Sequence, residues 1–291
     1  MKRIAIMGLG LMGGSLGLAL KARGFDGIVA AYARRPETRT AALAKGVVDE
    51  AFEHPADAVR EADLVIYCTP ILTIPSLMES CNRVFKEGAL LTDVGSTKDE
   101  LTARVNAALA GSRAVFVGSH PIAGSEQQGL EAARADLYDG SLVVVTPGSD
   151  TTDKSQSVQR IADFWSSLGA LVRVISAAEH DRLMARTSHL PHMVASLLAA
   201  TAARSGENRE MGPYCGAGFR DTTRVASGSP DVWHDIVSTN AAAIQVELEA
   251  YRERLDRLID WMDAKEFETV KDLLEEGRTA RCALMAHSPA E

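Results

Sequence analysis

The fold is decided by the stretch RIAIMGLGLMG, residues 3–13. Its first five residues form a short, mostly apolar run, which is typical of a strand covered on both faces. The run leads directly into the pattern G-x-G-x-x-G, and residues 15–22 after it can form a helix. A strand, a glycine-rich turn and a helix in this order predict a β-α-β unit that binds a dinucleotide.

Each residue of the glycine pattern has an expected task. Gly8 permits the tight turn, Gly10 lets the backbone approach a pyrophosphate, and Gly13 lets the helix pack closely on the strand. Leu11 and Met12 lie where the helix begins, and its free N–H groups and positive dipole attract phosphate. The pattern alone also fits a turn without a ligand, but the surrounding strands and helix favour a nucleotide. We therefore predict that all five residues bind the cofactor.

The end of the second predicted strand, residues 28–32, bears on the choice of cofactor. An NAD enzyme usually places Asp or Glu on the ribose about 20 residues beyond the motif. Ala33 occupies that place here, and Arg34 and Arg35 follow it. Without a carboxylate, repulsion of a 2′-phosphate is relieved, and two guanidinium groups can grip it. The alternative is a pair of solvated arginines beside an NAD site. We predict NADP, with NAD possible.

The first half of the chain alternates between apolar runs and helical stretches. The apolar runs that fit further strands are residues 64–68, 89–92, 114–117, 142–145 and 171–175, and the helical stretches include 38–45, 74–84 and 98–109. This alternation predicts an α/β fold with a Rossmann-type, doubly wound, mainly parallel sheet. We also expect Thr69 and Pro70, which directly follow one of these strands, to contact the cofactor.

The second half of the chain has a different character. After about Ser176 it is rich in Ala, Leu, Glu and Arg, with apolar residues three and four positions apart and no strand pattern. We predict a dinucleotide-binding domain at 1–176 and an all-helical substrate and dimerisation domain at 177–291. The stretch 231–274 exceeds an ordinary helix. A single helix would project and need a partner, which favours a homodimer, whereas two helices broken near Asp263 fit equally well.

The bulk composition limits the possible partners. The 291 residues are 46% hydrophobic and 24% charged, as in soluble globular proteins. A formal net charge of −8 argues against nucleic acid or an anionic membrane as a partner. If the substrate is an anion, local arginines must bind it against the overall negative charge. The four cysteines show no CxxC pairing. We expect reduced thiols in a cytoplasmic protein.

Several polar segments carry a more specific signal. They are TDVGSTK at 92–98, GSHPIAGSE at 118–126, TSHLPH at 187–192, GAGFRDTTR at 216–224 and PDVW at 230–233. In this order and at these separations they resemble the prephenate/arogenate dehydrogenase family. The resemblance extends from the glycine motif to at least Trp233. Its specificity comes from the combination, because the glycine motif alone fits many families.

The resemblance implies an NAD(P)-dependent oxidative decarboxylation of prephenate or arogenate, on the route to tyrosine. It implies that His120 and Ser96 are catalytic. It further implies substrate-binding roles for Ser125, Glu126, His189, Ala217, Arg224 and Trp233. Trp233 matches a family tryptophan that is contributed across a dimer interface. Ala217 departs slightly from the family, since some members carry glycine there.

Elementary chemistry gives these roles a reason. Neutral His120 can accept a hydroxyl proton because imidazole titrates near the working pH. Ser96 can hydrogen-bond the same hydroxyl or orient the histidine. The nicotinamide carries the redox step. Arg224 can hold a carboxylate in a fork and so fix the ring. A tight grip on the departing carboxylate would stabilise the ground state, so we expect Arg224 to serve orientation.

Other interpretations were weighed against this one. His189 and His192 stand three apart, as metal ligands can, but the sequence places no third ligand and we predict no metal. Two-domain hydroxyacid dehydrogenases rely on a lysine in the helical region, and residues 177–264 contain none. A non-catalytic NADP-binding sensor would not need His120, Ser96 and Arg224 together.

The side chain of the substrate stays open at this point. Prephenate carries a keto group where arogenate carries an ammonium group, so an acid such as Glu126 or Asp181 beside it would favour arogenate. The sequence does not place either acid there. It also leaves open the roles of Asp181, Arg220 and His192.

Overall fold

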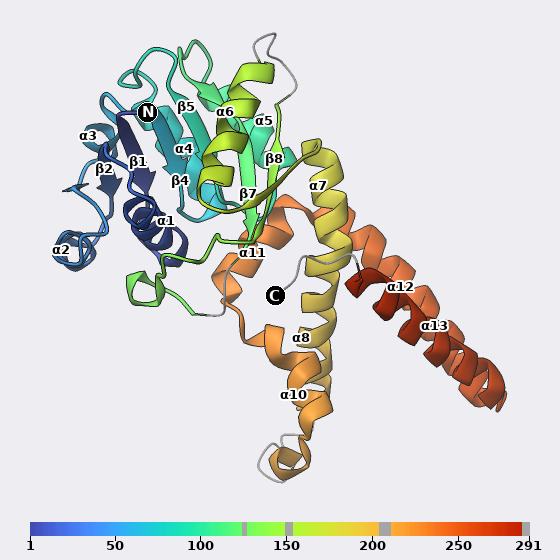
Figure 1. Cartoon of the computed structure of the whole chain (residues 1–291). Helices are drawn as coiled ribbons and strands as arrows, with labels where there is room; N and C mark the ends of the chain where they lie inside the picture. Colours follow the sequence, from blue (N-terminus) through green and yellow to red (C-terminus); the bar gives the residue numbers. More distant parts are fainter. Residues whose placement is uncertain (124–126, 149–153, 204–210, 287–291) are drawn as a thin grey trace.

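The computed structural model describes residues 1–123, 127–148, 154–203 and 211–286. Strands and helices alternate in the first part of the chain (Figure 1): β1 Arg3–Met7, α1 Leu11–Ala22, β2 Ile28–Tyr32, α2 Pro36–Ala44, β3 Glu50–Phe52, α3 Pro55–Val59, β4 Leu64–Tyr67, η1 Ile71–Thr73, α4 Ile74–Cys81, β5 Leu90–Asp93, α5 Asp99–Ala108, β6 Val115–Phe116, β7 Gly118–Ile122, η2 Leu130–Ala132, β8 Leu142–Thr146, α6 Lys154–Ser167 and β9 Leu171–Val174.

The later described residues are helical: α7 Ala177–Met184, η3 Ala185–His189, α8 Leu190–Ala202, η4 Gly212–Tyr214, α10 Ala217–Thr223, η5 Arg224–Ser227, α11 Pro230–Thr239, α12 Ala241–Asp263 and α13 Phe267–Met285. η3 is a single π-helical turn inserted between two α-helices. None of the helices in the described ranges is long and apolar enough to cross a membrane.

The main sheet has the strand order β3-β2-β1-β4-β5-β6, and every pairing in it is parallel. Side chains alternate along β1, so that Ile4 and Ile6 pack into one core and Ala5 and Met7 into the other. Helices α1 and α6 contribute to the first core, and α4 and α5 contribute to the second. The predicted Rossmann-type sheet followed by a helical domain is confirmed.

The last three strands form a separate sheet in the order β7-β8-β9, which the sequence did not reveal. β7 runs antiparallel to β8, with His120 opposite Val144. The sequence indicates for residues 118–126 only a polar segment that follows the predicted strand at 114–117. Ser119 and Pro121 of β7 are buried while Ile122 is exposed, which is the alternation of a strand. Pro121 is tolerated because β7 is an edge strand.

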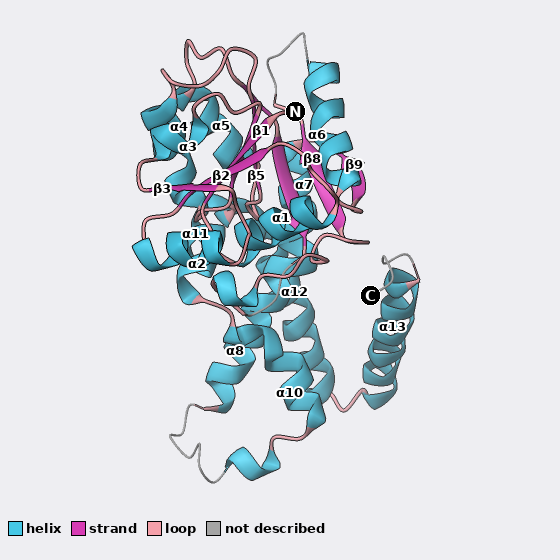
Figure 2. Cartoon of the chain, turned by 60° about the vertical axis from the view of Figure 1, so that its left-hand side comes forward, coloured by secondary structure: helices cyan, strands magenta, loops and turns pink. Residues whose placement is uncertain are grey.

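The long helical stretch is interrupted twice. α11 ends at Thr239, and α12 ends at Asp263, the position where a break was one of two interpretations. Lys265, with a φ of 59°, lies in the turn between α12 and α13. These last two helices extend away from the sheet, and α13 stands clear of α8 and α10 (Figures 1 and 2). They carry exposed apolar side chains, among them Val246, Leu255, Ile259, Met262, Leu274 and Leu284.

Candidate active site

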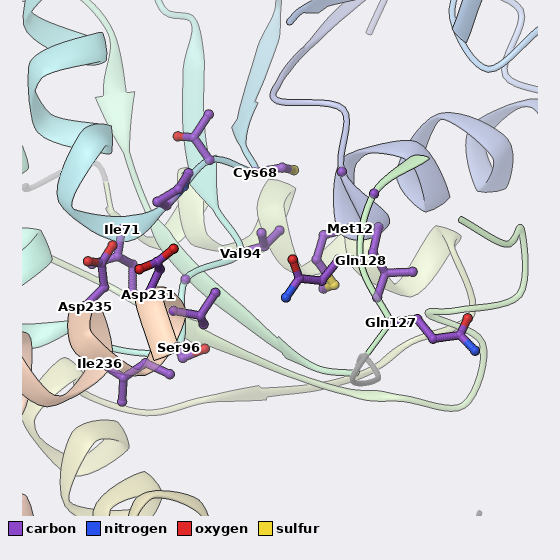
Figure 3. Close-up of a pocket in the computed structure, with 17 residues that line it drawn as sticks. Met12, Cys68, Ile71, Val94, Ser96, Gln127, Gln128, Asp231, Asp235 and Ile236 are labelled. Carbon is purple, nitrogen blue, oxygen red and sulfur yellow. The ribbon is translucent and has the colours of Figure 1, made fainter. Parts of the chain in front are cut away.

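A cavity of about 420 Å³ lies where the carboxyl edge of the main sheet meets α11. Six of the predicted site residues line it: Gly10, Leu11, Met12, Thr69, Pro70 and Ser96. α11 closes the opposite side with Asp231, Val232, Asp235 and Ile236 (Figure 3). Gln127 and Gln128, which follow β7, also border the cavity. Five of the predicted cofactor residues and Ser96 therefore face one space, whereas Gly8, Gly13, Arg34 and Arg35 are not among its lining residues.

The glycine turn has the shape that a dinucleotide requires. Gly8 has a φ of 110°, and a Cβ there would lie 2.9 Å from the carbonyl oxygen of Cys68. A Cβ on Gly13 would lie 1.9 Å from the Gly8 oxygen, so the helix packs directly on the turn. A Cβ on Gly10 would meet no atom within 4 Å, and α1 begins without a side-chain cap. The start of α1 thus offers backbone N–H groups to the cavity, which fits a pyrophosphate.

Arg34 and Arg35 lie exposed in the turn between β2 and α2. Arg39 organises this turn, because its guanidinium donates to the carbonyl oxygens of Ala33 at 2.8 Å and Arg34 at 3.0 Å. It also pairs with Glu53 at 3.2 Å. Arg39 was not predicted from the sequence, although it lies only four residues after Arg35.

His120 is in direct contact with a second histidine. Its Nδ1 lies 2.8 Å from Nε2 of His180, and Nδ1 of His180 lies 2.7 Å from Oδ1 of Asp181. The carboxylate of Asp181 accepts, so Nδ1 of His180 carries the proton and Nε2 of His180 is an acceptor. Nδ1 of His120 must then be the donor between the two rings. The free lone pair of His120 is therefore on Nε2, as a general base requires.

Asp181 is held in place by a helix terminus. Its two carboxylate oxygens accept from the backbone N–H groups of Lys98 at 2.8 Å and Asp99 at 2.9 Å, where α5 begins. His180 is fully buried and Asp181 is 4% exposed. The structure therefore places both residues in the interior beside His120.

Burial and nearby basic groups keep His120 uncharged. Burial is the main reason why the pKa of His120 lies well below its usual value. The nearby basic groups of His180, Lys98 and His189 lower the pKa further. The imidazole is thus neutral at neutral pH and available to take a proton.

His189 belongs to the same polar network. The side-chain amide of Asn240 donates to the carbonyl oxygen of Asp181 at 2.9 Å and lies 3.2 Å from Nδ1 of His189. Burial lowers the pKa of His189 to about 4, although Asp181 opposes the shift. A neutral ring that accepts at Nδ1 carries its proton on Nε2, so His189 can donate there. The π-helical turn that ends at His189 is a feature often found at functional sites.

Trp233 packs against histidines of its own chain. Its ring stacks on His192 with 3.5 Å between ring centroids, and it meets His189 edge to face at 6.0 Å. A Cβ on Gly228 would lie 2.8 Å from Nε1 of Trp233, so this glycine leaves room for the indole. Burial lowers the pKa of His192. In this chain, His192 supports the tryptophan.

The remaining predicted residues lie elsewhere. Arg224 begins η5, which packs on α8, and Ala217 begins α10; both residues are exposed, and neither is among the described residues that line the cavity. Arg220 donates to the carbonyl oxygen of Cys215 at 3.1 Å. Ser125 and Glu126 fall outside the described residues. Within the described ranges, no group of three His, Cys, Asp or Glu side chains converges as metal ligands would.

Comparison with known proteins gives a consistent result. Residues 16–174 match the family model of the prephenate dehydrogenase nucleotide-binding domain, and residues 176–276 match that of the prephenate dehydrogenase dimerization domain. A cyclohexadienyl dehydrogenase from Zymomonas mobilis is 34% identical over 97% of this chain and 96% of its own length. A prephenate dehydrogenase from Bacillus subtilis is 34% identical over 92% of this chain and 74% of its own.

Solved structures agree. Prephenate dehydrogenase from Aquifex aeolicus, in complex with hydroxyphenyl propionate and NAD+, superposes with a TM-score of 0.89 at 30% identity and covers 98% of both chains. Arogenate dehydrogenase from Synechocystis superposes with a TM-score of 0.81 at 29% identity, over 97% of this chain and 99% of that one.

The fold, the glycine turn and the two matching family models define the class: a dehydrogenase with a Rossmann-type nucleotide-binding half and a helical half. Within that class, the chain belongs to the prephenate/arogenate dehydrogenase family.

The low pKa of His189 predicts a pH-dependent stability. Below the unfolded-state pKa of 6.5 the unfolded chain binds a proton that the folded chain binds only near pH 4, so stability falls as the pH drops from 6.5 towards 4. His189→Asn keeps an acceptor for Asn240 and removes this proton. Between pH 7.5 and 5.0 the variant should lose about 2 kcal/mol less free energy of unfolding than wild type.

Urea denaturation at the two pH values measures this difference. His54→Gln, which changes an exposed histidine of the nucleotide-binding half, is the matched control and should keep the wild-type pH dependence. A His189→Asn variant with the wild-type pH dependence would contradict the assignment.

Proposed function

We propose that the chain catalyses the oxidative decarboxylation of prephenate, arogenate or both, with hydride transfer to NADP, in tyrosine biosynthesis. The observation that carries the proposal is the contact between His120 and His180, because it leaves a neutral base in a chain of this family. Relatives named cyclohexadienyl, prephenate and arogenate dehydrogenases support the substrate class.

In this proposal His120 takes the proton of the ring hydroxyl at Nε2. His180 accepts the hydrogen bond from His120 Nδ1–H, and Asp181 holds His180, so the positive charge that forms on His120 has a polar partner. Ser96, at the wall of the cavity, orients the same hydroxyl. When bound, the nicotinamide supplies the acceptor for the hydride. Loss of the carboxylate then makes the ring aromatic.

The substrate-binding roles also remain proposals. We assign the ring carboxylate to Arg224 and a hydrogen bond from Nε2–H to His189. Trp233, through its stack with His192, would form an apolar wall. The further residues proposed to contact substrate are Ser125, Glu126 and Ala217. We do not assign Asp181 to a substrate ammonium group, since its carboxylate is engaged by His180 and by α5.

We infer a preference for NADP over NAD. Ala33 leaves the end of β2 without a carboxylate, and Arg34 and Arg35 stand exposed beside it. Arg39 holds the backbone of this turn by two hydrogen bonds, so the side chains of Arg34 and Arg35 extend from a fixed backbone. A solved relative was crystallised with NAD+, so the preference of this chain between NADP and NAD is to be tested by experiment.

We predict that His120→Gln lowers kcat by about 100- to 10,000-fold, the range that general acid–base catalysis contributes. The KM for the nicotinamide nucleotide should stay close to wild type, because the histidine acts on the substrate. Steady-state rates of nucleotide reduction with prephenate and with arogenate measure this. A variant that keeps more than half of the wild-type kcat would contradict the role of His120.

We predict that Arg34→Ser combined with Arg35→Ser raises the KM for NADP at least about 10-fold, as loss of a charge-assisted hydrogen-bonding pair should. The KM for NAD should be little changed. Arg60→Ser, a change to another arginine of the nucleotide-binding half, is the control and should alter neither value. Equal use of both nucleotides by wild type would contradict the role of the arginine pair.

We propose that residues 1–176 bind the nucleotide and that residues 177–291 complete the substrate site and form a homodimer. Apolar side chains on α12 and α13 support the dimer: Leu255 is 44% exposed and Ile259 is 50% exposed on one face of α12. The match of residues 176–276 to a dimerization domain points the same way.

Leu255→Glu combined with Ile259→Glu should raise the dissociation constant of the dimer at least about 100-fold, because two carboxylates of each protomer would be removed from water on association. Sedimentation equilibrium measures the dissociation constant. Leu43→Glu on α2 is the control, since Leu43 is also 44% exposed but lies in the nucleotide-binding half. A monomeric wild type, or an unchanged dimer in the double variant, would contradict this arrangement.

A further inference from the structure

A buried ion pair lies directly behind the proposed catalytic residues. Asp93 is the last residue of β5, Lys98 precedes α5, and both are completely buried. The ammonium group of Lys98 pairs with Oδ2 of Asp93. Removing two charges from water is unfavourable, so such a pair persists only where further hydrogen bonds satisfy it. Asp93 makes such hydrogen bonds with the backbone of two other segments.

The carboxylate of Asp93 receives hydrogen bonds from two different segments. Oδ2 accepts from the backbone N–H of Gly95 at 2.8 Å, and Oδ1 accepts from the backbone N–H of Ser119 at 3.1 Å. In addition, the hydroxyl of Ser119 donates to the carbonyl oxygen of Asp93 at 2.6 Å. Gly95 directly precedes Ser96, and Ser119 directly precedes His120. One carboxylate thus joins the backbone beside each proposed catalytic residue.

We propose that Asp93 is a positioning residue, whose carboxylate sets the placement of Ser96 relative to His120, and that Lys98 neutralises it in the dry interior. The inference rests on the catalytic roles proposed above for Ser96 and His120. Asp93 would not touch the substrate. It would act through the two backbone segments that it joins.

The surroundings leave these segments little freedom to move. A Cβ on Gly95 would lie 2.8 Å from Oδ2 of Asp93 and 2.6 Å from Cγ1 of Ile71. A Cβ on Gly118 would lie 3.2 Å from Cδ of Lys98 and 2.5 Å from Oγ1 of Thr146. Both segments therefore need glycine to approach the ion pair as closely as they do.

The ion pair is also connected to the second histidine. The backbone N–H of Lys98 donates to Asp181, which holds His180 against His120. Lys98 therefore contributes its side chain to Asp93 and its backbone to Asp181. The short segment 93–98 thus contains Ser96, and through hydrogen bonds it also holds the segment of His120 and, by way of Asp181, His180.

Replacing Asp93 by Asn tests the positioning. The amide keeps one oxygen, so its NH₂ group must face either Ser119 N–H or the Gly95 and Lys98 donors, and one set of contacts becomes repulsive. A misplacement of about 1 Å in a catalytic group costs on the order of 100-fold in rate. Asp93→Asn should therefore lower kcat by about 100-fold while the Kd for NADP, measured by fluorescence titration, changes less than about 3-fold.

Asp63→Asn is the matched control. Asp63 also accepts from two backbone N–H groups, of Lys2 and Arg3, and pairs with Lys86 at 2.5 Å. It lies before β4, at the opposite edge of the main sheet from the cavity. Asp63→Asn should lower Tm and leave kcat unchanged.

A second variant separates position from stability. Asp93→Asn combined with Lys98→Met removes both charges, so it should recover much of the Tm lost in the single variant, because no unpaired ammonium group stays buried. Its kcat should remain about 100-fold low, since the bridge between Gly95 and Ser119 is still damaged.

Three results would overturn the inference: a folded Asp93→Asn with kcat within about 3-fold of wild type, a kcat that recovers together with Tm in the double variant, or failure of both variants to fold, which would assign Asp93 to stability. Wild type that reduces neither NADP nor NAD with prephenate and arogenate would instead refute the proposed function, so the two failures are distinguishable.

Discussion

The carboxylate of Asp181 receives hydrogen bonds from two parts of the chain, and the arrangement of the site depends on them. Backbone N–H groups at the start of α5 fix the carboxylate, and His180 donates to it from α7. Because Asp181 accepts from Nδ1 of His180, Nε2 of His180 must accept from Nδ1 of His120. Asn240 extends the same network to His189. The packing of the helical half on the nucleotide-binding half therefore also determines which nitrogen of His120 is free.

Apart from the carboxylate of Asp181, the buried groups of the site carry little net charge. His120 and His189 have lowered pKa values because they are buried, and Asp93 is neutralised by Lys98. The whole chain carries a formal charge of −8, so it has no general attraction for an anion. An anionic ring acid would depend on a local cation such as Arg224 for binding, and on neutral groups for the chemistry. Because the cation for binding and the neutral groups for the chemistry are different residues, His120 can stay unprotonated beside the substrate.

The sequence predicted the features that depend on local pattern. The glycine motif, the parallel strands and the helical second half follow from periodicity and turn chemistry, and Ser96 was placed at the cavity. The pairing of His120 with His180 joins residues 60 positions apart, which no periodicity records. β7 was missed because its polar residues and Pro121 hide the alternation of an edge strand. The break at Asn240 was missed although Ser238, Thr239 and Asn240 form a cluster that is typical of a turn; its tertiary contact with Asp181 could not be read from the sequence.

The central claim is that this site couples hydride removal to loss of a carboxylate. The direct measurement is the stoichiometry of a single reaction mixture with prephenate or arogenate and NADP, following reduced nucleotide, carbon dioxide and the aromatic product together. We expect one reduced nucleotide and one carbon dioxide for each aromatic ring formed, with all three lost in parallel in His120→Gln. Release of carbon dioxide without nucleotide reduction, or no reaction with either acid, would contradict it.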